Sequence, residues 1–270
     1  MKNIVLLGSK GNIGKSFLLR NKFNHNIYAD KDYEIDNLLD KKFIEKHKIE
    51  FVINCIGSIK NKSFFFHSNF FLPLSIAKAL NKNNKKISLI HLSSMGVNDP
   101  YGQLSTSPFK LNIDKRKKLN FNNYELSKCC AEYLLKEFLN DNIITFIIQP
   151  SAVINKNSRL LNKIYLLLFI LPFRLPFNSK PPVTNIEKLV ECFENIVNGK
   201  FYKPIKKENN ISTIQVFERI PLNKLLPLYK YFLFFKFPIN KIILDNLLKS
   251  LPDFYPFSSF KRIIRFLSFI

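Results

Sequence analysis

Three glycines in the segment GSKGNIG constrain the fold of this chain more than any other feature, because they directly follow the apolar segment NIVLL. The sequence holds only seven glycines in 270 residues, so a cluster of three marks a place where the backbone turns sharply or approaches a ligand. Residues 3–8 are predicted as a buried strand and residues 14–23 as a helix. Gly8, Gly11 and Gly14 therefore predict a tight turn that leads into a helix N-terminus.

Short apolar segments and helical segments alternate over the first 150 residues. Strands are predicted over 3–8, 26–30, 51–57, 87–94 and 143–150, and helices over 14–23, 38–48, 71–82 and 123–139. Such alternation indicates a parallel sheet with helices on both faces. The predicted fold class is therefore α/β, a Rossmann-type doubly wound parallel sheet with a smaller C-terminal substrate-binding part, whose ligands bind at the carboxyl ends of the strands.

The glycine segment at the end of the first strand predicts a dinucleotide-binding loop, because backbone N–H groups at a helix N-terminus can approach a pyrophosphate. The candidate cofactor residues in this loop are Gly8, Lys10, Gly11, Asn12, Ile13 and Gly14. Asp30 ends the second strand, where a carboxylate can accept hydrogen bonds from the adenosine ribose and favours NAD. Lys10 and Lys31 favour NADP instead, because each could meet a 2′-phosphate. The expected cofactor is NAD or NADP, with a preference for NAD.

The net charge of +22 attracts phosphate-bearing partners such as nucleotides or anionic lipid, although compositional drift is the alternative explanation. No nucleic-acid partner is expected, because no recognition motif for nucleic acid is found. Cys55, Cys129, Cys130 and Cys192 show no metal-ligand spacing, so no metal site is expected, and reduced thiols indicate a cytoplasmic protein. The longest apolar segment, 164–173, is too short for a membrane span, and the N-terminus is not expected to be a signal peptide.

Tyr124 precedes Lys128 by four residues in the segment YELSK, at the start of the predicted helix 123–139. Residues at this spacing share one face of a helix, and an ammonium beside a phenol eases the loss of the phenol proton. The spacing alone does not establish a proton-transfer pair, because Tyr202 and Lys206 repeat it, with a proline between them. The position of each pair in the fold has to distinguish the two.

The motifs GSKGNIG, FVINCIG, HLSSMGV, YELSK and QPSAV follow one another in an order and spacing that resemble the extended short-chain dehydrogenase/reductases, the NAD-dependent epimerase/dehydratase family. The segment YEIDNLLDKKFIEKHKIEFVINCIG is similar to dTDP-4-dehydrorhamnose reductases in particular. The resemblance covers residues 1–155 and, more weakly, residues 180–200.

The resemblance implies a catalytic set at the position of the tyrosine and lysine. Tyr124 matches the general acid/base of the family, and Lys128 matches the lysine that holds the nicotinamide ribose and lowers the pKa of the phenol. Ser94 matches the serine that hydrogen-bonds the reacting oxygen, with Ser93 as the alternative. Such a set suits hydride transfer to or from a sugar carbon, in which the phenol moves the proton of the oxygen.

The resemblance also implies cofactor contacts at and after the strand ends. These residues are Asp36, Asn37, Cys55, Ile56, Gly57, Asn69, Tyr124, Lys128, Gln149 and Pro150. Asn69 matches a family asparagine near the cofactor, and an ordinary helix N-cap is the alternative. The sequence departs from the family where Gln149-Pro150 replaces the usual Arg-Pro.

The dinucleotide-binding domain is expected over residues 1–155, with residues 183–200 returning to it. Residues 156–182 and 201–270 are expected to form the substrate-binding or lid region. Its end, 219–270, interleaves aromatic side chains with Lys and Arg. This segment is expected either to fill the core of the lid or to contact an anionic membrane, which would place the protein at the inner face of the membrane.

Two functions follow from these features. The first is an NAD(P)-dependent oxidoreductase or epimerase, with a homodimer as one expectation, that acts on a nucleotide-linked or lipid-linked sugar in surface polysaccharide synthesis. The second is a non-catalytic, nucleotide-binding scaffold, similar to the accessory reductase-like subunit of respiratory complex I. The complete set of Ser94, Tyr124 and Lys128 favours the first. The sugar, and the choice between reduction, epimerisation and dehydration, stay open at this point.

Overall fold

The computed structural model describes residues 1–58, 66–97, 123–154, 173–174, 182–200, 204, 206–208, 210–220 and 237–238. The chain divides into two compact units. The first unit consists of residues 1–151 and 186–216, and the second consists of residues 152–185 and 217–270.

Within the described residues, the first unit contains a seven-stranded sheet in the order β2-β1-β3-β4-β5-β10-β9. Its strands are β1 (Asn3–Leu7), β2 (Asn26–Ala29), β3 (Phe51–Asn54), β4 (Ile87–Leu92), β5 (Ile143–Pro150), β9 (Lys206–Glu208) and β10 (Ile211–Val216). All neighbouring strands pair in parallel except β9, which pairs antiparallel to β10. The expected Rossmann-type doubly wound sheet is confirmed.

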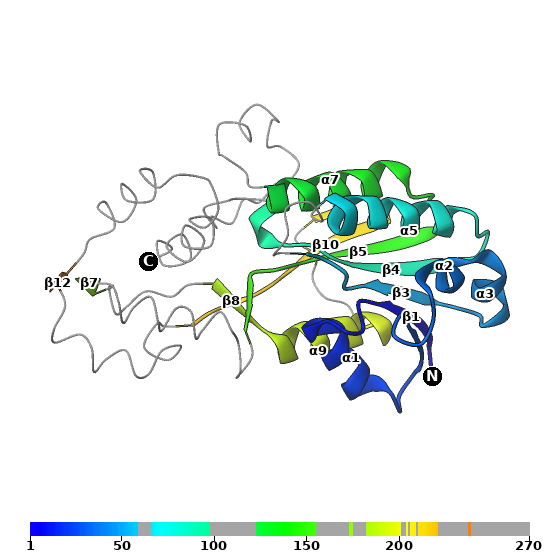
Figure 1. The fold of residues 1–270 in the computed structure, drawn as a ribbon, viewed down its shortest axis with the longest axis horizontal. Coiled ribbons are helices and arrows are strands. Elements are labelled where there is room, and N and C mark those ends of the chain that lie inside the picture. The colour runs from blue at the N-terminus through cyan, green and yellow to red at the C-terminus, as the bar shows by residue number, and fades with distance from the viewer. Residues whose placement is uncertain are drawn as a thin grey trace. The chain divides into compact units, whose positions relative to one another are not determined.

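Helices cover both faces of this sheet (Figure 1). The helices and helical turns are α1 (Asn12–Asn21), α2 (Ile35–Leu39), α3 (Lys41–Lys46), η1 (His67–Phe71), α5 (Leu72–Asn81), η2 (Met95–Val97), α7 (Asn123–Phe138) and α9 (Ile186–Val197). In Figure 1, α1 and α9 lie on one face and α5 and α7 on the other. Apolar residues therefore occupy successive positions of the strands rather than alternate ones, as expected for a parallel sheet that is covered twice.

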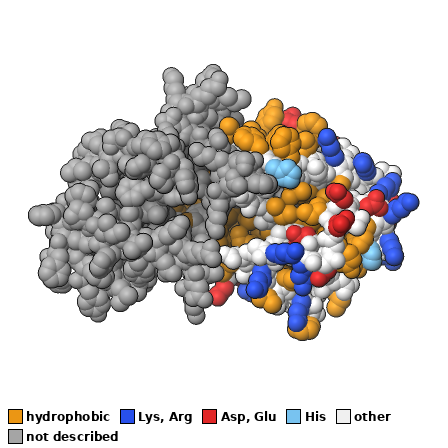
Figure 2. Space-filling model, viewed as in Figure 1, with side chains coloured by type: hydrophobic (Ala, Val, Ile, Leu, Met, Phe, Trp, Pro, Cys, Tyr) orange, Lys and Arg blue, Asp and Glu red, His pale blue; other side chains and the backbone are white. Residues whose placement is uncertain are grey.

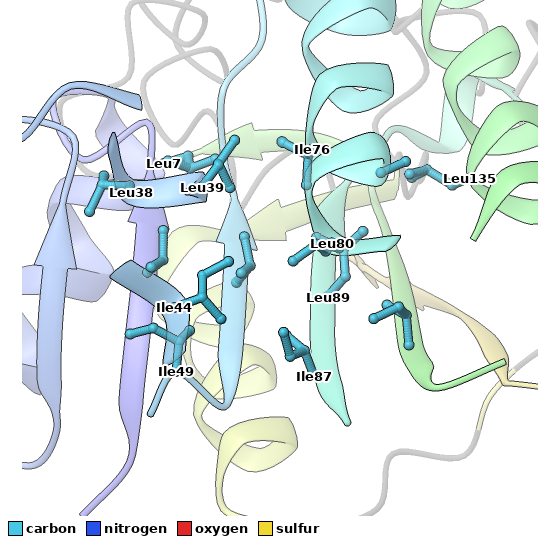
Figure 3. Packing of buried hydrophobic residues seen from close by; sticks show 14 of the residues in the cluster. Leu7, Leu38, Leu39, Ile44, Ile49, Ile76, Leu80, Ile87, Leu89 and Leu135 are labelled. Carbon is cyan, nitrogen blue, oxygen red and sulfur yellow. The ribbon is translucent and has the colours of Figure 1, made fainter. Parts of the chain in front are cut away.

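The face under α2, α3, α5 and α7 carries a continuous hydrophobic core (Figure 3). Strand residues such as Val5, Val52 and Leu89 pack there against helix residues such as Ile76 and Leu135, and all five are at most 1% exposed. Burial of a side chain of this size contributes roughly 1.5–3 kcal/mol to the stability of the fold. This core fixes α5 and α7 on the sheet, and both helices carry residues of the candidate site.

On the opposite face, α9 packs against α1 although the two helices are far apart in sequence. The rings of Phe17 and Phe193 have centroids 6.1 Å apart, and both side chains are fully buried. Glu194 accepts a hydrogen bond of 2.9 Å from Asn21 Nδ2, and it forms an ion pair with Arg20 at 2.7 Å. These contacts hold α9 against α1. Residues 183–200 were expected to return to the first domain, and in the structure the first unit resumes at Ile186.

Two expected helices differ from the structure for local reasons. The helix expected over 38–48 is wrong, because the chain is extended at Asp40, whose carboxylate accepts hydrogen bonds from Lys42 N and Phe43 N. Asp40 therefore ends α2 and caps α3. The helix expected over 71–82 is preceded by the π-helical turn η1. Pro73 lacks the N–H that an α-helix would donate to the carbonyl of the residue four positions earlier, and the turn widens there.

The boundary expected within the C-terminal part is also wrong. Residues 201–270 were expected to belong to the substrate-binding region, but β10 pairs in parallel with β5 through six residues, from Ile211 opposite Thr145 to Val216 opposite Pro150. The segment ISTIQV has apolar residues only at positions 211, 214 and 216, so it has neither the continuous apolar character of the earlier strands nor a regular alternation.

The second unit contains short strands among its described residues. A three-stranded sheet has the order β11-β8-β6, and β12 pairs with β7. Their bounds are β6 (Ala152–Ile154), β7 (Phe173–Arg174), β8 (Pro182–Asn185), β11 (Glu218–Arg219) and β12 (Phe237–Pro238). Nearly all of the basic aromatic segment 219–270 lies outside the described residues, so its contact with a membrane stays a prediction.

Charged side chains on the described surface are mixed in sign. In the view of Figure 2, Lys and Arg side chains lie along the edge that α2 and α3 occupy in Figure 1, with Asp and Glu side chains between them. This face therefore shows scattered basic side chains rather than one basic patch. Of the helices that the structure describes, none is long and apolar enough to cross a membrane.

Gly199 ends α9 and gives a direct test of the fold. Its φ of +71° is left-handed, Gly199 N donates to Ile196 O at 3.1 Å, and Lys200 N donates to Asn195 O at 2.7 Å. Nothing lies within 4 Å of a Cβ built on Gly199, so Gly199→Ala meets no steric clash and only the backbone conformation opposes it. We expect Gly199→Ala to lower the free energy of unfolding by about 1 kcal/mol in denaturant titrations.

The control is Gly199→Asn, since asparagine tolerates the left-handed conformation better than alanine does. Its loss of stability should be smaller than that of Gly199→Ala. An equal loss in both variants would contradict the assignment of a left-handed cap.

Candidate active site

The expected site residues come together because the strands are parallel. Gly8 follows β1, Asp30 follows β2, Gly57 lies just beyond β3, and Ser94 lies just beyond β4. Parallel strands end at the same edge of a sheet, so these residues share one edge. The chain leaves β1 for β2 on one side and later returns to β3 on the other, which makes the end of β1 the switch point where ligands of such sheets bind.

The glycine loop is tightly folded on itself. Gly8 has a φ of +87°, and Gly11 N donates to Gly8 O at 3.0 Å. A Cβ on Gly14 would lie 2.2 Å from Gly8 O, which no side chain can satisfy without moving the backbone. Gly11, in contrast, is exposed, and a Cβ there would meet only Gly8 O at 3.3 Å. Gly8 and Gly14 are therefore required by the turn, whereas Gly11 leaves the outer side of the loop open.

The first turn of α1 begins directly from this loop. Gly11 is its N-cap without a side-chain hydrogen bond, and the first turn carries no acidic residue. The backbone N–H groups at a helix start have no partner within the helix, and the helix dipole adds positive potential there. The loop and the start of α1 thus offer the backbone donors that a pyrophosphate needs.

Asp30 holds the glycine loop in place. Its carboxylate accepts hydrogen bonds from Gly8 N at 2.9 Å and from Ser9 N at 2.8 Å, one on each oxygen. A carboxylate oxygen has more than one acceptor position, so Asp30 can brace the loop and still accept a hydrogen bond from a ribose hydroxyl. The contact with the loop was not predicted from the sequence. The predicted contact with a ribose hydroxyl stays a prediction.

Lys128 is the most unusual side chain of the site, because its cation is buried. It is 2% exposed, and its Nζ donates to Leu92 O at 2.7 Å, at the end of β4. Burial lowers the pKa of Lys128 from 10.5 to about 8, while the nearby Glu132 and Cys55 raise it. A Cβ on Gly57 would lie 3.2 Å from the ammonium, so Lys128 also lies against the loop after β3.

Ser94 and the first turn of α7 lie on either side of Gly96. A Cβ on Gly96 would be 3.3 Å from the side chain of Glu125 and 3.5 Å from the Oγ of Ser94. Gly96 N donates to this Oγ at 3.2 Å, and both Ser94 and Tyr124 are only partly buried. Ser94 therefore lies beside the turn that carries Tyr124, with both side chains partly accessible.

Ser93 faces a different environment from Ser94. It is 3% exposed, and its Oγ donates to the carboxylate of Glu132. A hydroxyl held in this way is not available to a substrate oxygen. Ser94 accordingly stays the candidate for that role, and Ser93 has a position in the buried network instead.

Asn69 joins three segments around the site. It is fully buried inside η1, its Oδ1 accepts from Ser58 N at 3.1 Å, and its Nδ2 donates to Ser58 O at 3.2 Å and to Ser127 Oγ at 3.1 Å. Ser127 Oγ in turn donates to Tyr124 O at 2.7 Å. The alternative of an N-cap is wrong, because Asn69 lies within the helical turn and Phe66 precedes it as the cap. Asn69 links the loop after β3 to the turn that carries Tyr124.

The other residues that the family resemblance suggested have varied surroundings. Lys10, Asn12, Asp36 and Asn37 are exposed, Ile13 and Ile56 are partly buried, and Pro150 is buried at the end of β5. The Cys55 thiol has its pKa raised to about 12 by burial, so it stays protonated. Gln149 is fully buried, and its side chain contacts Glu132 and Gln215. Its amide thus has a structural contact, and the expected contact of Gln149 with a cofactor stays a prediction.

The second pair with the four-residue spacing is Tyr202 and Lys206. Lys206 begins the strand β9, and Tyr202 lies outside the described residues. Tyr124 and Lys128 both lie within α7, where a spacing of four residues places them on the same side of the helix.

Sequence reasoning missed three polar residues that support the site. Asn54 is fully buried, accepts a hydrogen bond from Ile56 N at 3.1 Å and lies 3.2 Å from the Nδ1 of His91. Ser127 and Glu132 lie on α7, each buried. The available signal was spacing: Tyr124, Lys128 and Glu132 recur every four residues, which aligns them along one side of a helix.

Comparison with known proteins identifies the family. The model of the NAD dependent epimerase/dehydratase family matches residues 6–160. No curated protein matches the chain.

Solved structures with the same fold have low sequence identity to the chain. The dTDP-4-dehydrorhamnose reductase from Yersinia enterocolitica has a TM-score of 0.60 at 16% identity, over 90% of this chain and 85% of that one. The dTDP-4-dehydrorhamnose reductase from Bacillus anthracis in complex with NADP has a TM-score of 0.57 at 14% identity, over 89% and 85%. The UDP-glucuronic acid 4-epimerase from Bacillus cereus in complex with NAD has a TM-score of 0.55 at 16% identity, over 88% and 87%.

The family match extends from the middle of β1 to beyond β5 and includes the glycine loop, Ser94, Tyr124 and Lys128. The resemblance to the extended short-chain dehydrogenase/reductases is thereby confirmed. Because this match covers more than half of its residues, the chain belongs to the NAD dependent epimerase/dehydratase family.

Proposed function

We propose that this protein is an NAD(P)-dependent oxidoreductase or epimerase that acts on a nucleotide-linked sugar by hydride transfer, with Tyr124 as the acid/base. The observation that carries the proposal is the buried ammonium of Lys128, which lies four residues after Tyr124 on α7 and contacts the strand end that leads into Ser94. A buried cation is costly, and its place beside a partly exposed tyrosine is typical of a functional site.

The residues present fit a nicotinamide dinucleotide. Gly11 leaves the outer side of the loop open, the first turn of α1 offers backbone donors, and Asp30 lies where a ribose hydroxyl can donate to it. Bound there, the dinucleotide supplies or accepts the hydride. The carboxylate of Asp30 favours NAD, because a 2′-phosphate beside it would be repelled.

Each residue of the catalytic set has a separate task. Tyr124 transfers the proton of the reacting oxygen, and the ammonium of Lys128 stabilises the phenolate that forms when Tyr124 gives up its proton. Ser94 donates its hydroxyl hydrogen to the reacting oxygen and orients it towards the phenol. Water is displaced from Lys128 by its burial, which strengthens its electrostatic effect on the phenol.

The solved neighbours support a sugar nucleotide as the substrate, since their names describe enzymes of dTDP-linked and UDP-linked sugars. Surface polysaccharide synthesis, in the cytoplasm or at the inner face of a membrane, is the pathway that we propose for such a substrate. The scaffold function is less well supported, because a scaffold has no use for a cation that costs free energy to bury.

The first test is dinucleotide binding. We expect calorimetry to show one NAD(H) or NADP(H) bound per chain, and we expect Gly11→Leu to abolish binding while its thermal unfolding stays within a few degrees of the wild type. The reason is that Gly11 is exposed, has no strained backbone and meets only one atom in the loop.

Gly14→Ala is the matched control for this test. Its Cβ would lie 2.2 Å from Gly8 O, so this variant should lose stability as well as binding. Wild-type protein that binds neither dinucleotide would refute the proposed function.

The second test is proton transfer. We expect Tyr124→Phe to retain dinucleotide affinity and to lose at least about a hundredfold in turnover, the scale of a positioned acid/base. Tyr133→Phe is the control, since Tyr133 is a 63% exposed tyrosine of the same helix, and it should keep wild-type turnover. Turnover that survives in Tyr124→Phe on any sugar nucleotide would remove Tyr124 from the mechanism.

The third test is the pH dependence of turnover. The pKa of Lys128 is lowered to about 8 by burial, so the side chain is charged below this pH and loses its proton above it. We therefore expect kcat/KM to fall as the pH rises through about 8, because the neutral amine no longer stabilises the phenolate. Arginine stays charged throughout this pH range, so any activity that Lys128→Arg retains should not fall as the pH rises through about 8. A wild-type profile that stays flat to pH 10 would contradict the assignment.

A further inference from the structure

A cluster of buried polar side chains lies behind the candidate site, between α7 and the ends of three strands. Its members are Ser93, Lys128, Glu132 and Gln149, and each of them is at most 3% exposed. Gln215 of β10 extends the cluster, because its Nε2 donates to Gln149 Oε1 at 3.3 Å. Burying this many polar groups costs free energy unless they are paired with one another, so their arrangement calls for a reason.

Glu132 is the centre of this cluster. Ser93 Oγ donates to its Oε1, and Gln149 Nε2 donates to Oε1 at 2.9 Å and to Oε2 at 3.0 Å. A carboxylate that accepts three hydrogen bonds inside a protein is stabilised in its charged form. Glu132 thereby joins the end of β4, the end of β5 and helix α7 at one point.

Ser93 and Gln149, which donate these three hydrogen bonds, are neutral side chains. Lys128 is four residues earlier on α7, one turn away on the same side, and its pKa is raised by Glu132 against the larger effect of burial. Among the described residues, Cys55 after β3 and His91 on β4 also interact electrostatically with Lys128, and Tyr124 lies one turn before it on α7. Burial keeps Cys55 and His91 uncharged near neutral pH. Among the described residues with an electrostatic effect on Lys128, Glu132 is thus the anion that offsets its charge.

We propose that Glu132 is a positioning residue of the candidate site. It keeps Lys128 charged, and it holds Ser93, and thereby the neighbouring Ser94, at a fixed position relative to Tyr124. This inference rests on the proposed function, because it assigns Glu132 a role towards that site. Glu132 touches neither substrate nor cofactor in this role. It acts through the charge of Lys128 on one side and through the hydroxyl of Ser93 on the other.

Glu132 can position Ser94 because it holds the side chain of the preceding residue, Ser93. Ser93 and Ser94 are consecutive at the end of β4, and Ser93 N donates to Ile148 O at 2.7 Å, so the backbone there is tied to β5 as well. Ser93 Oγ is held by Glu132, whereas Ser94, the next residue, is partly buried and its Oγ accepts from Gly96 N. The same helix that carries Glu132 carries Tyr124, so one rigid element sets the spacing between Tyr124 and Ser94.

The experiment measures the protonation of Lys128 directly, in protein labelled with 13Cε-lysine. An NMR titration of the full chain identifies Lys128 as the signal that is missing in Lys128→Arg and that titrates far below the other lysines. We expect a wild-type midpoint of about 8. In Glu132→Gln, which keeps the shape of the side chain and removes its charge, we expect the midpoint to fall by at least about one pH unit, the scale of an opposite charge nearby.

Three further variants separate charge from shape. Glu132→Asp keeps the charge, so its midpoint should stay within about half a unit of the wild type. Glu137→Gln removes an exposed carboxylate of the same helix and should not shift the midpoint. Gln149→Arg places a cation against Glu132 and should lower the midpoint while Glu132 is still present, which provides a second measurement should Glu132→Gln not fold.

A midpoint that is unchanged in Glu132→Gln, or that falls equally in Glu137→Gln, would overturn the proposal. If Glu132→Gln does not fold, an unchanged midpoint of Lys128 in Gln149→Arg would also overturn the proposal. The titration needs neither cofactor nor substrate, so its outcome is independent of whether the proposed function holds. In the same variants, the falling limb of kcat/KM should move to lower pH by the same amount as the NMR midpoint, which a purely structural glutamate would not produce.

Discussion

The contact between the buried ammonium of Lys128 and the carbonyl of Leu92 is the interaction on which the candidate site depends. It fixes α7 to the carboxyl end of β4, and these two elements carry Tyr124 and Ser94. Burial makes this contact strong, because a hydrogen bond from a charged donor gains strength when water is excluded. Burial also lowers the pKa of Lys128 to about 8, so the desolvated cation is close to losing its proton near neutral pH. A site that relies on this charge therefore needs a nearby anion, and Glu132 is placed to be one.

The glycine loop shows the opposite solution, in which backbone groups rather than charges form the binding surface. Gly8 and Gly14 pack so closely that the start of α1 lies directly behind the end of β1. Asp30 then pairs with two backbone N–H groups of the loop and prevents it from relaxing. The N–H groups of the first turn of α1 have no partner within the helix, and the first turn carries no acidic residue that would repel an anion. Rigid backbone donors lose little entropy on binding, which makes such a loop well suited to a pyrophosphate.

The features that the sequence predicted are those that depend on local pattern. The five strands of the first 150 residues, the glycine turn and the placement of Tyr124 and Lys128 on one helix all follow from spacing and residue type. The break at Asp40 was equally local but was missed, because the apolar spacing continues across it and an internal aspartate reads as a solvated helix residue. The widened turn at Asn69 was missed because its cause, Pro73, lies after it in the chain.

The remaining features depend on contacts between distant segments, and no local pattern contains them. Strand β10 belongs to the sheet because β5 offers it a free edge, which a sequence of six residues does not record. The contact between Ser93 and Glu132 spans 39 residues, and the contact between Asn69 and Ser127 spans 58. Each of these residues, taken alone in the sequence, resembles an ordinary polar side chain of a helix or a strand end.

Gln149 illustrates how such a distant contact can set a chemical property. An arginine at this position would pair with Glu132 and neutralise it, which would leave the charge of Lys128 opposed by burial alone. Glutamine donates to both oxygens of Glu132 without a charge, so Gln149 itself does not neutralise the carboxylate. The departure of Gln149-Pro150 from the family pattern, which in the sequence is only a mismatch, therefore has a consequence in the structure. On the proposed role of Glu132, an uncharged partner at position 149 leaves the carboxylate to raise the pKa of Lys128 against the effect of burial.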